Sequence, residues 1–245
     1  MKVLGIDIGG SSLKGAPVDT KTGQLLAERH RIETPERLSP AEMGAAIARM
    51  AAHFDWKGPV GVGFPGVVQG PHIRTSANLH PDFVDLDAAA ELERIVGAEI
   101  SLVNDADAAG LAEVAFGAGR DVKGAVLMLT FGTGVGSSMF VDGILYPNTE
   151  FGHLRKNGDS WEKYVSGAAK ERRGLSYEAW AADVSDYLRE LEDLVWPDLI
   201  IAGGGISADH AKWFPYLKNR TRVVPAEFLN EAGLVGAALH AARAL

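Results

Sequence analysis

The sequence lacks cysteine, long apolar runs and any excess of positive charge. Its 245 residues include no cysteine, which excludes disulfides, thiolate nucleophiles and cysteine-ligated zinc. No apolar run reaches about 18 residues, and the first residues lack the apolar region of a signal peptide. We therefore expect no membrane partner and a cytoplasmic location. The net charge of −8 argues against a nucleic-acid partner.

What is present is an ordinary globular composition, with 47% hydrophobic and 23% charged residues, in a chain long enough for one large domain or two small ones. Apolar and β-branched runs predict strands at 3–8, 13–18, 24–32, 59–64, 100–103, 125–129, 137–141, 199–202 and 221–224. Helical periodicity and capping residues predict helices at 40–54, 87–96, 105–116, 176–196 and 230–245.

A weak internal echo suggests two related halves. Gly10-Ser11-Ser12, followed by a strand and Asp19, resembles Gly136-Ser137-Ser138, followed by a strand and Asp142. No linker separates the halves. We divide the chain into a smaller α/β domain, residues 1–104 with the C-terminal helix 231–245, and a larger α/β domain, residues 105–230.

Three glycine clusters each follow a predicted strand. Glycine lets the backbone approach a ligand closely, and the exposed N–H groups of such turns can bind anions. None of the clusters matches the P-loop pattern, and none opens a helix in the dinucleotide-binding manner. Together they favour a phosphate-binding cleft over three plain turns. The clusters are Gly9-Gly10-Ser11-Ser12, Thr130-Phe131-Gly132-Thr133-Gly134 with Gly136, and Gly203-Gly204-Gly205.

Asn104 and Asp105 stand where a predicted buried strand ends and a helix begins. Ligands of α/β folds bind at the carboxyl ends of strands, so Asp105 is a candidate catalytic base. Either residue could instead simply cap the helix, which is the commoner role at such a position.

Further polar residues are candidates with plain alternatives. Asp7 could hold Mg²⁺ through water or only bond its own turn, and Lys14 could reach a phosphate or lie on a strand surface. Glu150 and His153, spaced three apart around a glycine, could face a polar ligand or form a surface pair. Asn78 could be a turn former, and Glu162 a first-turn acid favoured by the helix dipole.

The ordered motifs resemble the ROK family of sugar kinases, which have the two-domain actin-like ATPase (ribonuclease H-like) fold with a cleft between related halves. The resemblance covers nearly the whole chain. Within the family, a second set is similar to the polyphosphate glucokinases: Pro147 to Leu154, Gly174 to Tyr177, Trp196 to Leu199, and the tail around Val223 to Ala226 and Gly233 to Ala238. The motifs for the family are Asp7 to Gly10, Gly63 to Gly66, Asn104-Asp105, Thr130 to Gly136, Glu150 to His153 and Gly203 to Gly205.

The resemblance implies roles for matching residues. Asp105 would be the base, and Mg²⁺ would accompany the donor. Glucose would be held by Gly66, Asn78, Asn104, Glu150, His153 and Glu162. The phosphate donor would be lined by Asp7, Gly9, Gly10, Ser11, Ser12, Lys14, Thr130, Gly132, Thr133, Gly134, Gly203, Gly204 and Gly205. Many relatives place a cysteine cluster after the Gly-His pair to bind zinc. Because this sequence has no cysteine, no zinc is expected. Glu162 follows the segment in which the cluster is missing, so its sugar-binding role is carried over across a departure from the family pattern.

The implied activity is transfer of the terminal phosphoryl group of inorganic polyphosphate, ATP or both to the 6-hydroxyl of glucose, by a homodimer as in the family. An alternative is an ATP-only hexose or N-acetylhexosamine kinase on the same scaffold. A sugar-sensing transcription regulator shares the fold but would need a DNA-binding segment ahead of the strand at Val3. A polyphosphate donor would need basic residues along its path, with candidates Lys14, Arg155, Lys156, Lys170, Arg172, Arg173, Lys212, Lys218, Arg220 and Arg222.

Overall fold

The chain forms two compact units in the computed structural model, which describes residues 1–76 and 79–244. Unit 1 comprises Met1–Ala112 with Glu231–Leu245, and unit 2 comprises Glu113–Asn230. The division falls inside one helix, α3 (Asp105–Phe116), whereas the sequence placed it at the start of that helix. In the part of the chain described, none of the helices has both the length and the apolar character needed to cross a membrane.

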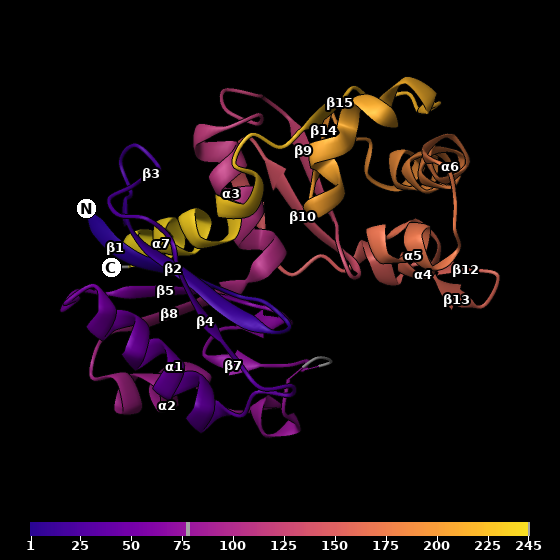
Figure 1. The fold of residues 1–245 in the computed structure, drawn as a ribbon. Coiled ribbons are helices and arrows are strands. Elements are labelled where there is room, and N and C mark those ends of the chain that lie inside the picture. Colours follow the sequence, from indigo (N-terminus) through magenta and orange to yellow (C-terminus); the bar gives the residue numbers. More distant parts are fainter. Residues whose placement is uncertain (77–78, 245) are drawn as a thin grey trace. The chain divides into compact units, whose positions relative to one another are not determined.

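Unit 1 is built on a six-stranded sheet of order β3-β2-β1-β5-β8, with β4 also paired to β2 (Figure 1). The hairpin β1–β2 is antiparallel, and β1, β5 and β8 run parallel. The strands are β1 (Lys2–Ile8), β2 (Ser12–Asp19), β3 (Gln24–Leu25), β4 (His30–Glu33), β5 (Val60–Phe64) and β8 (Ile100–Asn104). A small separate hairpin pairs β6 (Val68–Gln69) with β7 (His72–Ile73).

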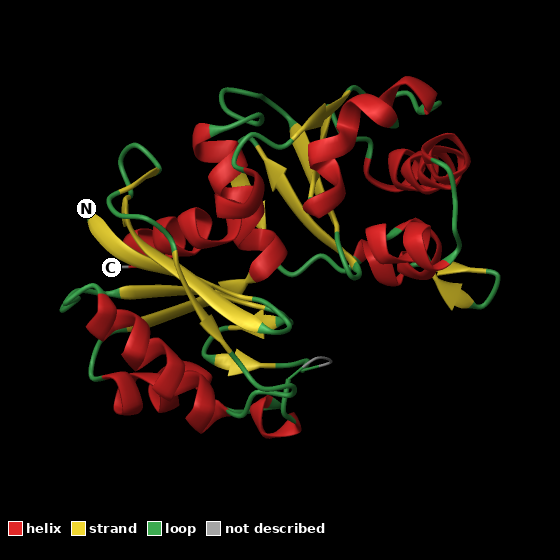
Figure 2. Ribbon diagram, in the orientation of Figure 1, coloured by secondary structure: helices red, strands yellow, loops and turns green. Residues whose placement is uncertain are grey.

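Three helices cover the two faces of this sheet (Figure 2). Helices α1 (Pro40–His53) and α2 (Ala88–Val96) pack on one another, and α1 side chains such as Ile47 join Leu4 and Ile6 of β1 in one core. Helix α7 (Ala232–Ala244) packs on β1, β5 and β8. A Cβ added at Gly5 would come within 2.0 Å of the Leu234 carbonyl oxygen, so this strand needs glycine where α7 approaches.

The helix boundaries of unit 1 follow the predicted capping residues. Ser39 and Glu42 form a capping box at the start of α1, with the Ser39 N–H donating to Glu42 Oε2 at 2.9 Å. Asp87 caps α2, and Gly97 ends it in the left-handed conformation with φ of 73°. The sequence predicted helices at 40–54 and 87–96, and both are confirmed.

The predicted continuous strand 24–32 was wrong, because the structure breaks it into β3 and β4. Val18 pairs with Leu25 and Gly15 with His30, so the four residues 26–29 face only Ala16 and Pro17. Pro17 has no N–H to donate to a partner strand, and a strand opposite it loses a ladder bond. The chain therefore loops out at this point.

Unit 2 is built on a five-stranded sheet of order β11-β10-β9-β14-β15 (Figure 1). The hairpin β9–β10 is antiparallel, and β9, β14 and β15 run parallel. The strands are β9 (Ala125–Phe131), β10 (Val135–Val141), β11 (Ile144–Tyr146), β14 (Leu199–Gly203) and β15 (Val223–Pro225). This is the strand order of unit 1 again, with a hairpin followed by two parallel strands.

An aromatic core holds the helices of unit 2 to its sheet. Trp180 of α6 (Tyr177–Val195) lies 5.8 Å from Phe131 of β9 and 4.9 Å from Trp213, measured between ring centroids. All three side chains are fully or almost fully buried. Further elements of this unit include the hairpin β12 (Arg155–Lys156) and β13 (Asp159–Ser160), the short helices α4 (Glu162–Val165) and α5 (Gly167–Arg172), and a 3₁₀ segment, η3 (Gly205–Lys212).

Candidate functional site

In unit 1 the predicted polar residues lie at the carboxyl ends of the parallel strands. Asp7 of β1 is in register with Gly63 of β5, and Phe64 of β5 with Asn104 of β8. Carboxyl ends of adjacent parallel strands meet at one edge of a sheet, where α/β folds bind ligands. The structure therefore brings Asp7 and Asn104 to the same edge, two strands apart.

Asn104 fixes the geometry around the start of α3. Its Oδ1 accepts a hydrogen bond from the Asp107 N–H at 3.0 Å, which caps the helix. Its Nδ2 donates to the Gly66 carbonyl oxygen at 3.1 Å, and only 5% of the residue is exposed. Asn104 thus ties the turn after β5 to the helix N-terminus.

Asp105 is the first residue of α3 and is partly exposed. Its Oδ1 accepts a hydrogen bond from the Ala106 N–H at 2.8 Å. A helix N-terminus stabilises an ionised carboxylate, the form that can accept a proton. The capping role and the candidate base therefore fall to two neighbouring residues: Asn104 caps, and Asp105 stands beside it. Asn78, another predicted sugar ligand of unit 1, lies outside the described residues.

The hairpin turn of β1–β2 carries a perturbed carboxyl group. The Gly9 N–H donates to the Ser12 carbonyl at 2.9 Å and closes the turn through Gly10 and Ser11. Burial raises the pKa of the Asp7 carboxyl, an effect opposed by the charges of Lys14 and Arg29. Lys14 is the cross-strand partner of Asp7.

Asp7 fits a magnesium ion only as a water-mediated partner. Within residues 1–76 and 79–244, no group of three or more histidine or acidic side chains is placed to hold a metal. Magnesium characteristically keeps several waters and takes one or two carboxylates together with substrate phosphates. Asp7, a single partly buried carboxylate opposite Lys14, is sufficient for such a water-mediated site but not for coordination by protein side chains alone.

In unit 2 the predicted sugar ligands come together. His153 Nδ1 lies 3.5 Å from Glu150 Oε2 within one turn. Burial raises the pKa of Glu150, the Glu162 charge raises it further, and His153 opposes them. A Cβ at Gly134 would come within 2.6 Å of Glu162 Oε2, so Glu162 lies against the glycine turn. Two carboxylates and an imidazole suit a ligand with several hydroxyl groups, because together they accept and donate hydrogen bonds.

Two buried hydroxyl residues, not singled out in the sequence, position this cluster. Ser137 Oγ of β10 accepts from the Phe151 N–H at 3.0 Å and donates to the Thr149 carbonyl at 2.8 Å. Thr149 Oγ1 donates back to the Ser137 carbonyl at 2.9 Å. The 3₁₀ turn Phe151–His153 is thereby fastened to the sheet. A serine alternating with apolar residues in a buried strand was the available signal.

The two glycine loops of unit 2 lie side by side. Gly203 is in register with Thr130, and the Gly132 N–H donates to the Gly134 carbonyl at 3.0 Å across Thr133. A Cβ at Gly204 would come within 2.6 Å of the Phe131 nitrogen, so only glycine allows this approach. Gly205 continues the loop with open space around it.

Helix α5 begins against the same loops. The Ala168 N–H donates to the Gly132 carbonyl at 3.1 Å, and a Cβ at Gly167 would lie 3.8 Å from Ile206 Cβ. Three backbone segments of unit 2 therefore converge where the sequence predicted donor binding.

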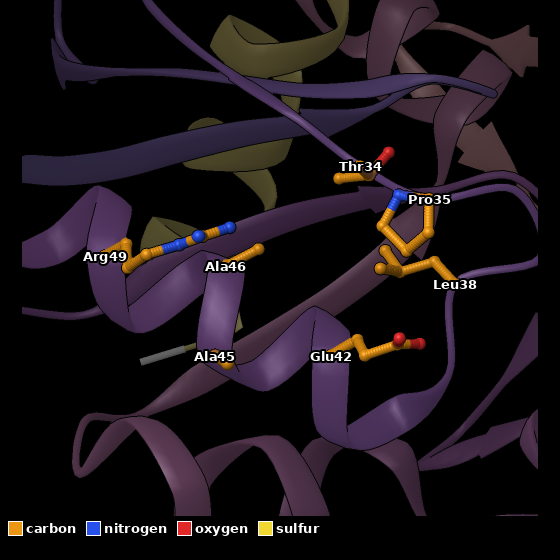
Figure 3. A pocket seen from close by; sticks show the side chains of 7 residues that line it. All are labelled: Thr34, Pro35, Leu38, Glu42, Ala45, Ala46 and Arg49. Carbon is orange, nitrogen blue, oxygen red and sulfur yellow. The ribbon is translucent and has the colours of Figure 1, made fainter.

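A pocket of about 280 Å³ lies elsewhere on unit 1 and contains none of the predicted site residues (Figure 3). Thr34, Pro35 and Leu38 line it from the segment before α1. The rest of its lining comes from α1 itself, namely Glu42, Ala45, Ala46 and Arg49. Glu42 already serves the capping box of that helix, so the pocket offers mostly apolar surface.

Comparisons with known proteins identify the family. The family model described as the ROK family matches residues 3–176. The chain is 46% identical over 237 residues to a polyphosphate glucokinase of Mycobacterium tuberculosis, covering 96% of this chain and 89% of the relative. It is 32% identical over 158 residues to an N-acetylgalactosamine kinase of a Shewanella species, covering 61% of this chain and 50% of the relative.

Among solved structures, the inorganic polyphosphate/ATP-glucomannokinase of an Arthrobacter species matches with a TM-score of 0.94 and 42% identity, covering 100% of this chain and 99% of that one. The α/β actin-like ATPase fold expected from the sequence is confirmed by this match. The family model spans well over half of the chain, and the mycobacterial relative nearly all of it. The chain therefore belongs to the ROK family.

Proposed function

We propose that the chain is a glucokinase that transfers the terminal phosphoryl group of inorganic polyphosphate, and also of ATP, to the 6-hydroxyl of glucose. The observation that carries the proposal is the 46% identity to a polyphosphate glucokinase over 96% of the chain. The structural match to a polyphosphate/ATP-glucomannokinase over the whole chain supports the same donors.

The acceptor is glucose, held by hydrogen bonds to its hydroxyl groups. Glu150, His153 and Glu162 supply acceptors and a donor from one cluster, which is the set that a polyol requires. Gly66, Asn78 and Asn104 complete the sugar contacts. A partly buried polar group that is matched to a hydroxyl discriminates strongly against sugars that lack it, because the group is then left unpaired.

Asp105 acts as the general base. The glucose 6-hydroxyl attacks the terminal phosphorus in line with the leaving oxygen, and Asp105 accepts its proton. A positioned base contributes about 10²–10⁴ in rate. A carboxylate is basic enough because the transition state of phosphoryl transfer is loose and most catalysis comes from positioning.

The phosphate donor lies along backbone N–H groups of the glycine turns. Gly9 to Ser12 with Lys14 contribute from one hairpin, Thr130 to Gly134 from the other, and Gly203 to Gly205 from the neighbouring loop. Asp7 would hold Mg²⁺ through water. When bound, the ion neutralises charge on the donor oxygens. The cysteine-ligated zinc of many family members is not expected here, because the sequence has no cysteine.

The enzyme works in the cytoplasm. It is a homodimer, as the resemblance to the family implies. An ATP-only hexose or N-acetylhexosamine kinase is the second candidate, favoured by the 32% identity to an N-acetylgalactosamine kinase. The two candidates differ in donor and in acceptor, so one assay separates them.

The deciding experiment measures product formation with purified protein, Mg²⁺ and either nucleotide-free polyphosphate or ATP. The acceptors are glucose, mannose and N-acetylhexosamines. Glucose 6-phosphate formed from polyphosphate is the expected result. Turnover with ATP alone, or preference for an N-acetylhexosamine, would establish the second candidate instead.

A further inference from the structure

A polyphosphate chain continues as a row of negative charges, whereas ATP ends in a neutral nucleoside. An enzyme that uses the polymer gains affinity from cations placed beyond the phosphates that react. The basic residues of unit 2 differ in the groups that hold them. Some are paired with carboxylates of α6 (Tyr177–Val195), whereas Lys170 and Lys212 contact the ring of Tyr177.

Three of the basic residues of unit 2 are committed to ion pairs with one helix. Arg173 lies 2.7 Å from Asp183, and Lys156 lies 3.8 Å from the same carboxylate. Arg220 lies 2.7 Å from Asp193. These cations are neutralised by carboxylates of the long helix α6, where they fasten neighbouring segments.

Lys170 is different. Its Nζ lies 4.2 Å from the centroid of the Tyr177 ring, and within residues 1–76 and 79–244 it forms no ion pair with a carboxylate. A cation over an aromatic face keeps its N–H groups available, because the ring takes no conventional hydrogen bond. Lys170 therefore presents a positive charge that is not paired directly with a carboxylate, although the Asp209 charge acts on it from a longer range.

Lys212 joins it on the same ring. Its Nζ lies 5.6 Å from the Tyr177 centroid and 2.7 Å from Asp209 Oδ1. The Tyr177 hydroxyl donates to Asp209 Oδ2 at 2.7 Å, which holds the ring near both lysines. The cluster therefore gathers two ammonium groups around one ring, with the carboxylates of Asp209 and Glu171 beside it.

The cluster grows from the glycine loops of unit 2. Lys170 lies on α5, whose first turn donates a backbone hydrogen bond to the Gly132 carbonyl. Lys212 is the last residue of η3, which begins at Gly205. Both lysines thus stand on elements that leave the loops assigned to the donor phosphates.

We infer that Lys170 and Lys212, held by Tyr177 and Asp209, form a subsite for the polyphosphate chain beyond the phosphates that line the glycine loops. This inference rests on the proposed function and adds the residues that distinguish the polymer from ATP. The remaining negative charges of the chain pair with the two ammonium groups, while the nucleoside of ATP has no charge to place there.

The test compares Lys170→Gln, Lys212→Gln and the double variant with the wild type. The control is Lys123→Gln. Lys123 is exposed and lies just before β9, and the glycine loop follows the other end of that strand, about 20 Å away. The readouts are kcat and KM for long-chain polyphosphate, ATP and glucose at several salt concentrations. Thermal melting confirms that each variant is folded.

Each single substitution should raise the KM for polyphosphate about three- to tenfold, and the double variant more than either. The KM values for ATP and glucose should stay within about twofold of wild type, as should every value of Lys123→Gln. The dependence of log KM for polyphosphate on log salt should become shallower by about one for each lost contact.

Three results would overturn the inference. An unchanged KM for polyphosphate in the double variant removes the lysines from the chain path. An equal rise for ATP shows that they serve the shared phosphates and not the polymer. A wild-type protein that uses ATP but not polyphosphate refutes the proposed donor itself, and this outcome is recognised without any variant.

Discussion

The hairpins β1–β2 and β9–β10 have the same construction and different chemistry. Asp7 is the second-to-last residue of β1, and Thr130 holds that place in β9. Each is in register with a glycine of the adjacent parallel strand, Gly63 for Asp7 and Gly203 for Thr130. The antiparallel partners differ, because Lys14 faces Asp7 while Gly136 faces Thr130.

The difference shows that a repeated scaffold need not repeat its function. The hairpin of unit 1 carries an acid–base pair at its turn. The hairpin of unit 2 is neutral there, and the acids of that unit lie on later segments at Glu150 and Glu162. We expect reaction chemistry to depend on unit 1 and sugar recognition on the acids of unit 2.

Asp105→Asn should lower kcat by about 10²–10⁴, because an amide does not accept the proton of the attacking hydroxyl. The dissociation constant for glucose, measured by calorimetry, should stay within about threefold, since the amide keeps the size and polarity of the carboxylate. The control is Asp87→Asn at the start of α2, where asparagine caps as well as aspartate. Near-normal kcat in Asp105→Asn would refute the assigned base.

Glu150→Gln should raise the KM for glucose by about 10–100-fold with a smaller change in kcat, because it replaces a charged acceptor in a partly buried polar site. Glu178→Gln, at an exposed position in the first turn of α6, is the control. A lowered kcat with unchanged KM would assign Glu150 to the reaction chemistry and would contradict the proposed division of roles between the units.

The pH dependence of glucose binding tests whether the ionised carboxylate of Glu150 holds the sugar. Burial first, and then the Glu162 charge, raises the pKa of Glu150. The ionised acceptor is therefore lost as the pH falls through a value above the ordinary glutamate range. Glucose affinity of the wild type should weaken over that interval, and Glu150→Gln should not show the transition. The same acid limb in both proteins would assign it to another group.

Much of this arrangement could be predicted from the sequence, because it depends on local patterns. Glycine after an apolar strand predicted the loops at residues 9–12, 130–136 and 203–205, and capping chemistry predicted the ends of α1 and α2. The echo between the halves, weak in sequence, appears in the structure as the same strand order in both sheets.

Other features depend on contacts between segments that are distant in sequence. Proximity of Glu162 to Gly134 depends on how α4 packs beside the β9–β10 turn, and no local pattern encodes it. The break between β3 and β4 depends on Pro17 in the neighbouring strand. The fastening of the Glu150 turn by Ser137 requires the register of a strand and a loop that only folding brings together.

Gly204→Ala tests how strictly the neutral loop of unit 2 is constrained. Gly204 has φ of 81°, and its Cβ would come within 2.6 Å of the Phe131 nitrogen, so alanine should cost about 1–3 kcal/mol of unfolding free energy. Gly205→Ala and Gly10→Ala are the matched controls, one in each unit, because nothing lies within 4 Å of their Cβ positions. Denaturant unfolding measures all three. Equal losses at Gly204 and Gly205 would contradict the close approach.

The smallest effect should come from removing the charge of Asp7 from the hairpin β1–β2. Burial raises the pKa of Asp7, which means that folding disfavours its ionised form. Stability is therefore lost as the pH rises through the folded-state pKa, and Asp7→Asn should recover it, raising the melting temperature at pH 8 by about 2 °C. The gain should vanish near pH 4, where the aspartate itself becomes protonated.

Thr130→Val is the control for that comparison, since threonine at the equivalent place in unit 2 carries no titratable group. Its melting temperature relative to wild type should be independent of pH between 4 and 8. A stabilisation of Asp7→Asn that is greatest at low pH would reverse the sign and show that Lys14 and Arg29 outweigh burial at this carboxylate. In that case the charged hairpin of unit 1 would be held together by its ion pair, and its carboxylate would be less available to magnesium than we propose.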